Sequence, residues 1–206
     1  EHFSYIFKRF ERIGFVGHNG CGKSTLMKIL SNLESADSGS IEWGETIRIG
    51  YFAQECEIMD ERQRVIDYIK DAAEYVRTSE GLVSASKMLE RFLFSSDMQY
   101  TPIAKISGGE RRRLYLLKVL MQSPNVLILD EPTNGLDPDG IKELLDLIRS
   151  LKAKGMTILV SSHQLLELSK VADHILILDK GKIQYDGENK NVDSLERLFF
   201  KIVHGG

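Results

Sequence analysis

A glycine-rich run that ends in a lysine and two hydroxyl residues carries the clearest chemical signal in this chain. Residues 17–25 read GHNGCGKST, which fits the pattern G-x-x-x-x-G-K-[ST] of a phosphate-binding loop. Glycines let backbone N–H groups curl around a phosphate, and the start of a following helix adds the positive end of its dipole. Lys23 is long enough to reach the β- and γ-phosphates of a nucleotide, and the Ser24 hydroxyl is an oxygen ligand for Mg²⁺.

Two adjacent acids follow an apolar run at 126–129. Two carboxylates that directly follow a buried strand are expected to have a polar function. Asp130 is placed to hold Mg²⁺ directly or through water. Glu131, one residue further on, is placed to polarise the water that attacks a γ-phosphate. For this pair in isolation, exposed acids at an ordinary strand end are an equal alternative. The phosphate-binding loop in the same chain favours the catalytic interpretation.

A second anion-binding helix start is predicted at Ser107-Gly108-Gly109-Glu110. Ser107 is a good N-cap, and the helix after it presents free N–H groups. Because the chain already has one phosphate-binding loop, this helix start would serve a different ATP. The alternatives are a flexible turn for the glycines and, for at least one arginine of 111–113, a solvated or salt-bridged helix face.

Two further polar residues end strand-like runs. His163 follows the run 158–160 after two serines, and Gln54 follows the run 49–53. Ligands of open α/β sheets bind at the carboxyl ends of strands, so His163 is a candidate γ-phosphate contact. A lone histidine at such a position is more often structural, and Gln54 alone carries little meaning.

The elements that must position these residues alternate between strands and helices. Apolar strand patterns at 126–129, 157–160 and 175–178 are separated by helical patterns, and a hairpin turn at 179–182 follows. This alternation predicts βαβ units and a mostly parallel sheet.

Residues 58–98 differ from the rest of the chain. They are rich in charge and helix formers, with apolar residues at helical spacing from Val65 to Val76 and a second helical patch at 84–94. This stretch predicts a helical insertion in the α/β core. An amphipathic helix at 192–203 is expected to pack against the parent domain.

Bulk properties narrow the class of protein. The chain has 206 residues, 42% of them hydrophobic, and a net charge of −3, which suits one substantial globular domain without a global basic field. No apolar run is long enough to span a bilayer, and no signal peptide pattern occurs. Two cysteines do not make a disulfide framework, so we expect a cytoplasmic setting, with any membrane association made through a partner.

Together these motifs resemble the ATP-binding cassette (ABC) ATPases in order and spacing over nearly the whole chain. The resemblance rests on GHNGCGKST, Gln54, ISGGE at 106–110, VLILDE at 126–131, Gly135-Leu136-Asp137 and His163. It implies an α/β P-loop NTPase fold in a single domain, with a core at about 1–57 and 106–190, a helical subdomain at about 58–105 and a C-terminal helix at about 192–203. It also implies a truncated N-terminus, because the adenine-stacking aromatic would precede Glu1. Phe3 and Tyr5 are nearby, but they read as strand residues.

The family's functional residues carry over to matching positions. ATP would contact the loop through Gly17, Asn19, Gly20, Cys21, Gly22, Lys23, Ser24 and Thr25. Mg²⁺ would be held by Ser24, Gln54 and Asp130, and Gln54 would also sense the attacking water. Glu131 would be the general base, and His163 would be the switch residue. Ser107, Gly108, Gly109 and Glu110 would contact the γ-phosphate of ATP on a second cassette, and Asp137 would lie between the two. Hydrolysis would therefore need a head-to-tail pair.

Two parts of the chain resemble different branches of the family. Residues 1–134 are similar to ABC-F proteins, ATPases that act on ribosomes, and 135–187 are similar to the ATPase subunit of an ABC exporter. Three hypotheses follow: a ribosome-associated ATPase, an exporter subunit with a transmembrane permease partner, or a truncated cassette that binds nucleotide weakly without turnover. None of them requires direct membrane insertion by this chain.

Overall fold

One six-stranded sheet places the phosphate-binding loop, the acid pair and His163 at the carboxyl ends of its strands. The structure, a computed structural model, describes residues 4–78, 80–153, 155–189 and 192–204. The strand order is β2-β5-β6-β1-β7-β8. All neighbours are parallel except β7 and β8, which form an antiparallel hairpin. The strand bounds are β1 Arg12–Val16, β2 Ile49–Phe52, β5 Val126–Leu129, β6 Thr157–Ser162, β7 His174–Asp179 and β8 Lys182–Glu188.

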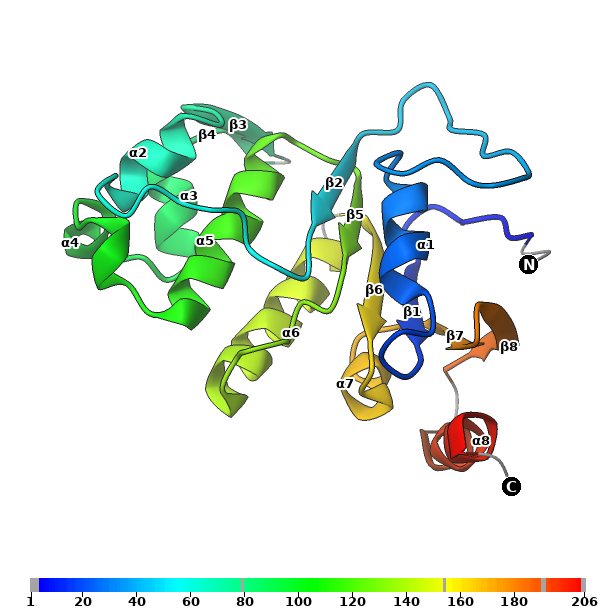
Figure 1. The fold of residues 1–206 in the computed structure, drawn as a ribbon. Coiled ribbons are helices and arrows are strands. Elements are labelled where there is room, and N and C mark those ends of the chain that lie inside the picture. Colours follow the sequence, from blue (N-terminus) through cyan, green and yellow to red (C-terminus); the bar gives the residue numbers. More distant parts are fainter. Residues whose placement is uncertain (1–3, 79, 154, 190–191, 205–206) are drawn as a thin grey trace.

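Helices cover both faces of this sheet (Figure 1). Helix α1 (Lys23–Leu30) packs on the face that carries Ile13 and Phe15. The opposite face is covered by α5 (Gly108–Met121), α6 (Pro138–Ala153), α7 (Leu165–Ser169) and α8 (Val192–His204). Because both faces are buried, the central strands are continuous apolar runs. The predicted α/β class with a mostly parallel sheet is confirmed.

The predicted strand runs match the structure closely. The run 126–129 is β5, and the runs 157–160 and 175–178 lengthen into β6 and β7. The hairpin turn predicted at 179–182 is also present, and its central residues Lys180 and Gly181 have φ angles of 47° and 72°. Two positive φ angles match the twist that a tight hairpin needs.

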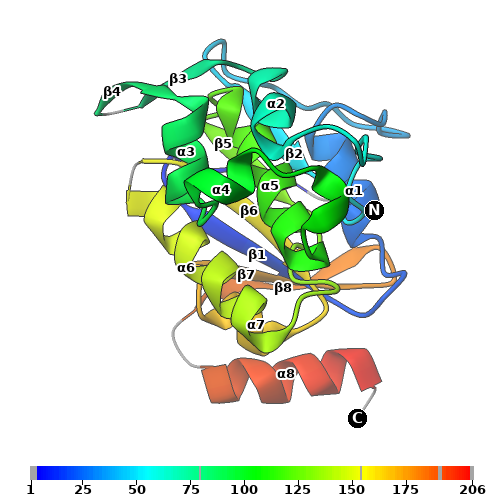
Figure 2. The same ribbon diagram turned by 90° about the vertical axis from the view of Figure 1, so that its left-hand side faces the viewer.

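The region between β2 and α5 contains short elements that form one end of the molecule (Figure 2). The prediction of helical spacing through Val76 is wrong in its second half, because α2 ends at Lys70 and Val76 lies in a strand. Val76 pairs with Val83 across a small hairpin, in which Gly81 begins β4 with a φ of 109°. The elements are α2 Val65–Lys70, β3 Tyr75–Thr78, β4 Gly81–Ser84, α3 Ala85–Arg91, α4 Ser96–Gln99 and the 3-10 turn η1 Ile103–Lys105.

The two ends of the described chain lie beside β7. Tyr5 was predicted as a strand residue, but it lies outside the strands and contacts the rings of Phe7 and His174 at centroid distances of 4.8 and 6.0 Å. Phe3 lies outside the described residues. Helix α8 contacts α7 and β7 and runs along the foot of the molecule (Figure 2). Within the described residues, no helix combines the length and apolarity needed to cross a bilayer.

Cys21 is 2% exposed and belongs to the apolar cluster that also contains Met27 and Leu30 of α1. Burial raises the pKa of the Cys21 thiol, and Lys23 lowers it by less. Cys56 is half-buried, and burial raises the pKa of its thiol too. The two cysteines thus differ mainly in how much of each side chain is accessible to a reagent.

We predict that a bulky thiol reagent modifies Cys21 at least about tenfold more slowly in the native protein than in urea, because reaction requires local opening. Mass spectrometry of the single variants Cys21→Ser and Cys56→Ser measures each remaining thiol alone. The Cys56 thiol should react faster than the Cys21 thiol in the native state. Equal Cys21 rates in native and urea-unfolded protein would contradict the buried position.

Candidate functional site

The phosphate-binding loop joins β1 to α1 and depends on glycine at three positions. A Cβ atom at Gly17 would come 2.4 Å from the backbone oxygen of Leu178, far inside contact distance. Gly20 and Gly22 have φ angles of 81° and 103°, which L side chains rarely adopt. The loop therefore keeps the shape that its sequence predicts, with Asn19, Gly20 and Thr25 exposed.

The turn between β7 and β8 supports this loop from behind. Gly181 N donates a hydrogen bond to Cys21 O over 3.0 Å. His18 Nδ1 lies 3.2 Å from Asp179 Oδ1, the last residue of β7. The shape of the loop is thus set by residues that come much later in the chain as well as by its own glycines.

Lys23 is buried at the centre of the loop. Its Nζ donates to Gly17 O over 2.9 Å and to His18 O over 3.1 Å. The same Nζ lies 3.1 Å from Glu131 Oε1, and both side chains are at most 5% exposed. This buried ion pair connects the loop after β1 to the loop after β5.

Hydroxyl groups from three elements surround the carboxylate of Asp130, which is 1% exposed. Ser24 Oγ and Ser161 Oγ donate to Oδ1 over 3.1 and 2.6 Å, and Tyr51 OH donates to Oδ2 over 3.2 Å. Burial, together with the negative charge of Asp130, raises the pKa of Tyr51, so its phenol stays a donor. Ser161 and Tyr51 were not predicted as site residues, although their strands neighbour β5.

Glu131 has a strained backbone and a fixed side chain. Its φ of 45° lies in the left-handed region, where a non-glycine residue persists only if its surroundings hold it. Its backbone N donates to Ser161 Oγ over 2.9 Å. Its Oε2 lies 2.9 Å from His163 Nδ1 and accepts from His163 N over 3.3 Å. The predicted base and the predicted switch residue are therefore in direct contact.

The other predicted residues lie apart from this cluster. The side chain of Gln54 is exposed and joins none of the hydrogen bonds above within the described residues. Ser107 and Glu110 form a capping box at the start of α5, with bonds of 3.2 and 2.7 Å between them. Figure 1 shows this helix start well away from the phosphate-binding loop. Asp137 Oδ1 accepts from Gly140 N over 2.9 Å in the first turn of α6.

The three arginines after Glu110 have different surroundings. Arg111 pairs with Glu61 on the surface, and Arg113 pairs with Glu143, as the salt-bridged alternative predicts. Arg112 is only 9% exposed, and burial lowers its pKa. No local pattern distinguishes these three positions, because their residue types are identical.

The oxygen atoms near Ser24 fit a hard cation. Ser24 Oγ and Asp130 Oδ1 are 3.1 Å apart, and a hydroxyl with a carboxylate is the donor type that Mg²⁺ prefers. The fit rests on donor chemistry and on this spacing.

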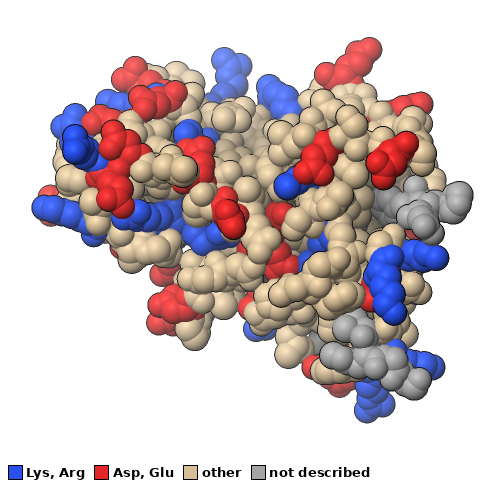
Figure 3. Space-filling view, viewed as in Figure 1, with Lys and Arg blue, Asp and Glu red and all other residues tan. Residues whose placement is uncertain are grey.

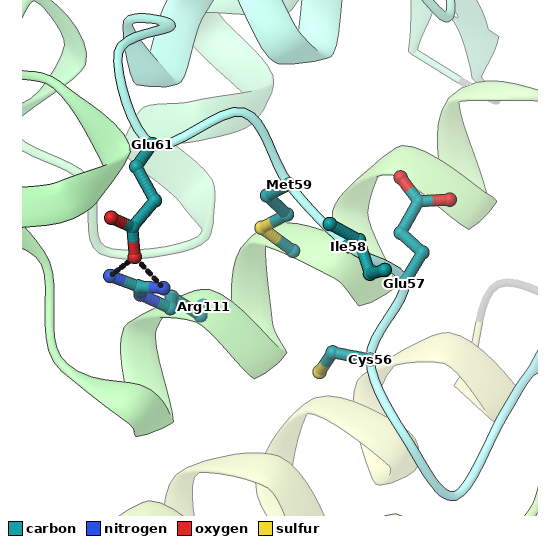
Figure 4. A pocket seen from close by; sticks show the side chains of 6 residues that line it. All are labelled: Cys56, Glu57, Ile58, Met59, Glu61 and Arg111. Carbon is teal, nitrogen blue, oxygen red and sulfur yellow. Dashed lines mark hydrogen bonds and ion pairs between the residues drawn. The ribbon is translucent and has the colours of Figure 1, made fainter.

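A separate hollow of about 330 Å³ lies on the helical end of the molecule. Figure 4 shows its lining, which comes from the segment 56–61 after Gln54 and from Arg111 on α5. Ile58 is fully exposed there. Elsewhere on the face drawn in Figure 3, acidic and basic side chains are interspersed rather than gathered into a field of one sign.

Comparison with known proteins agrees with the geometry. The family model described as "ABC transporter" matches residues 1–134. A relative from Bacillus subtilis, the uncharacterized ABC transporter ATP-binding protein YfmR, is 48% identical over 170 residues, 82% of this chain and 27% of its own length. The lantibiotic transport ATP-binding protein SrtF of Streptococcus pyogenes is 39% identical over 191 residues, 89% of this chain and 82% of its own length.

Further relatives and solved structures extend this picture. The energy-dependent translational throttle protein EttA of Haemophilus influenzae is 36% identical over 174 residues, 84% of this chain and 31% of its own length. A solved ATP-binding subunit of an ABC transporter superposes with a TM-score of 0.74 at 26% identity, covering 98% of this chain and 86% of that one. The chain thus spans about a quarter to a third of YfmR and EttA and most of SrtF. With its family model, its relatives and its fold in agreement, the chain belongs to the ABC transporter family of ATP-binding proteins.

Proposed function

We propose that the chain binds ATP with Mg²⁺ and hydrolyses it as one half of a head-to-tail pair of cassettes. The observation that carries this proposal is the hydrogen-bonded cluster at the carboxyl ends of β1, β5 and β6. There Lys23 contacts Glu131, Ser24 contacts Asp130, and His163 contacts Glu131. A phosphate-binding cation, a pair of oxygen ligands and a carboxylate base are thus assembled within one site.

Nucleotide binding would begin with an exchange of partners at Lys23. The ammonium group now contacts two loop carbonyls and Glu131 Oε1. A γ-phosphate carries more negative charge than a carboxylate, so it would take over Lys23 and release that oxygen. Glu131 Oε1 would then be free to accept a proton from the attacking water, while Oε2 stays on His163.

Ser24 and Asp130 are the residues that would hold Mg²⁺, with Gln54 approaching as the third ligand. A bound Mg²⁺ would neutralise charge on the β- and γ-phosphates and so favour attack by water. Ser161 and Tyr51 would keep the Asp130 carboxylate in one orientation.

The start of α5 would complete the site of a partner cassette. Its first N–H groups follow the capped residues Ser107 and Glu110, and it lies too far from this chain's own loop to serve it. A second cassette placed head to tail would receive Ser107–Glu110 against its γ-phosphate, with Asp137 between the two cassettes.

Substitution of the loop lysine tests the catalytic proposal. We expect Lys23→Ala to lower ATP hydrolysis at least about 100-fold, because one charged group that stabilises developing charge typically supplies that much. Release of phosphate from ATP with Mg²⁺ is the measurement. Lys28→Ala is the matched control, since Lys28 lies on the same helix and pairs with Glu34 on the surface. If the wild-type chain releases no phosphate, the weakly binding, non-hydrolysing alternative is correct.

The contact between Tyr51 and Asp130 predicts a metal-dependent phenotype. Tyr51→Phe should raise the Mg²⁺ concentration for half-maximal ATP binding about tenfold, because groups that orient a metal ligand commonly have effects of this size. Binding of a fluorescent ATP analogue in EDTA should not change. Tyr68→Phe is the control, since Tyr68 OH donates to Glu57 over 2.6 Å on the helical side. An equal shift in both variants would contradict a role at the metal.

For the biological role, we propose an ABC-F-like, ribosome-associated activity. Its support is the sequence pattern of residues 1–134 and the relation to EttA, which is named as a translational throttle protein. The second candidate is the ATPase subunit of an exporter, favoured by the relation to SrtF over most of SrtF's length. A permease would then dock near Gln54, where the hollow lined by residues 56–61 offers a surface.

Co-sedimentation separates the two candidate roles. With ATP, Glu131→Gln should accumulate in the ribosome pellet more than with ADP, because this substitution removes the base and keeps the paired state from turning over. A chain that shows no ATP-dependent enrichment with ribosomes, and that co-purifies with a membrane protein, would establish the exporter role instead.

A further inference from the structure

Arg112 is a buried cation that no described carboxylate neutralises. Its guanidinium donates to the backbone carbonyls of Gln54 over 2.7 Å, Glu131 over 3.2 Å and Pro132 over 3.2 Å. It also stacks over the ring of Phe52, 4.8 Å from its centroid. Burying a charge without an acid partner is costly, so each of these acceptors matters to its stability.

The three carbonyls come from the two segments that hold the predicted catalytic side chains. Gln54 follows β2, and Glu131 and Pro132 follow β5. These strands are neighbours, and Asp130 N donates to Phe52 O over 2.9 Å where both end. A planar guanidinium with five N–H groups can bind carbonyls on both segments at once, which a lysine ammonium cannot do in one plane.

The main chain of α5 connects this guanidinium to the capped helix start. Arg112 follows Gly108 by about one helical turn, roughly 6 Å at 1.5 Å rise per residue. The capping box of Ser107 and Glu110 closes that turn. Because one hydrogen-bonded turn connects them, a displacement of the helix start would also move Arg112.

We propose that Arg112 is a positioning residue that transmits the position of the α5 start to Gln54 and Glu131. The inference rests on the proposed function, in which the α5 start binds the phosphate of a partner cassette. Phosphate contact at Ser107–Glu110 would fix α5, and Arg112 would fix the backbone that carries the base. The base would then be correctly placed only when both cassettes are engaged.

The strained backbone of Glu131 makes this control effective. Its N–H is held by Ser161 and its carbonyl by Arg112, so the two bonds fix its peptide groups on both sides. Without the hydrogen bond from Arg112, fewer contacts hold the Glu131 backbone at its φ of 45°. A base displaced by about 1 Å can cost about 100-fold in rate, while phosphate binding by the loop is unaffected.

The first experiment separates turnover from binding. Arg112→Gln should lower the kcat of ATP hydrolysis about tenfold to 100-fold, while the KM for ATP and the Kd for ADP change less than about twofold. Arg111→Gln is the matched control, because it makes the same change one residue earlier, at a surface pair with Glu61, and should keep wild-type kcat. Arg112→Lys keeps the charge without the planar fork and should also lose kcat.

A double-mutant cycle tests transmission directly. Ser107→Ala should lower kcat in the wild-type and Arg111→Gln backgrounds, but it should have little further effect in the Arg112→Gln background. Additive effects of Ser107→Ala and Arg112→Gln would overturn the proposal. So would normal kcat in a folded Arg112→Gln protein, with folding checked by thermal unfolding.

These experiments distinguish failure of the positioning role of Arg112 from failure of the proposed ATP hydrolysis. If the wild-type chain does not hydrolyse ATP, the proposed function is wrong and the positioning role falls with it. If the wild type hydrolyses ATP and Arg112→Gln does not fold, Arg112→Lys carries the same test. An Arg112→Lys protein with normal kcat and an intact Ser107→Ala effect overturns the inference alone.

Discussion

The buried ion pair between Lys23 and Glu131 organises the site. It connects the loop after β1 to the loop after β5, two strands that are separated in the sheet by β6. Both charges are removed from water, so each depends on the other, and an unpaired buried charge would be strongly destabilising. A ligand that binds here must replace either the Lys23 ammonium or the Glu131 carboxylate with a group of the same charge. In the proposed function, nucleotide binding would therefore exchange one ion pair of Lys23 for another.

Two kinds of constraint surround that pair. Hydroxyl groups of Ser24, Ser161 and Tyr51 fix the carboxylate of Asp130 from three elements. Backbone contacts fix Glu131, with Ser161 on one side and Arg112 on the other. Ser161 belongs to both sets, because its buried hydroxyl donates to the Asp130 carboxylate and accepts from the Glu131 backbone N–H. Ser161 on β6 therefore links the side chain of Asp130 to the main chain of Glu131.

Much of this arrangement is readable from the sequence because local patterns determine it. Apolar runs of four residues predict the central strands, and glycine spacing predicts the phosphate-binding loop. The helical prediction through Val76 is wrong although Ala72, Ala73 and Val76 keep helical spacing. The hairpin depends instead on the pairing of Val76 with Val83 and on the positive φ of Gly81 at the start of β4. Cross-strand pairing of this kind is not local in sequence.

The residues that sequence reasoning missed share one property. Each contacts a group that is distant in the sequence: 79 positions away for Tyr51, 31 for Ser161, and between 19 and 58 for Arg112. Their roles therefore depend on strand register and helix placement. Register is fixed only when the sheet assembles. Conversely, Gln54 was predicted as a ligand of Mg²⁺, but its exposed side chain lies outside the cluster of Lys23 and Glu131. Ser107, which was assigned to the phosphate of a second cassette, caps α5 and also lies outside that cluster.

The support of the phosphate-binding loop by the β7–β8 turn has a consequence for synthesis of the chain. Strand β1 lies between β6 and β7, and Cys21 O accepts its bond from Gly181. A nascent chain that ends before this turn contains the whole glycine-rich sequence and both neighbours of β1, but it lacks the N–H group that donates to Cys21 O. The loop of an unfinished chain therefore lacks this support until residues 180–181 have been synthesised.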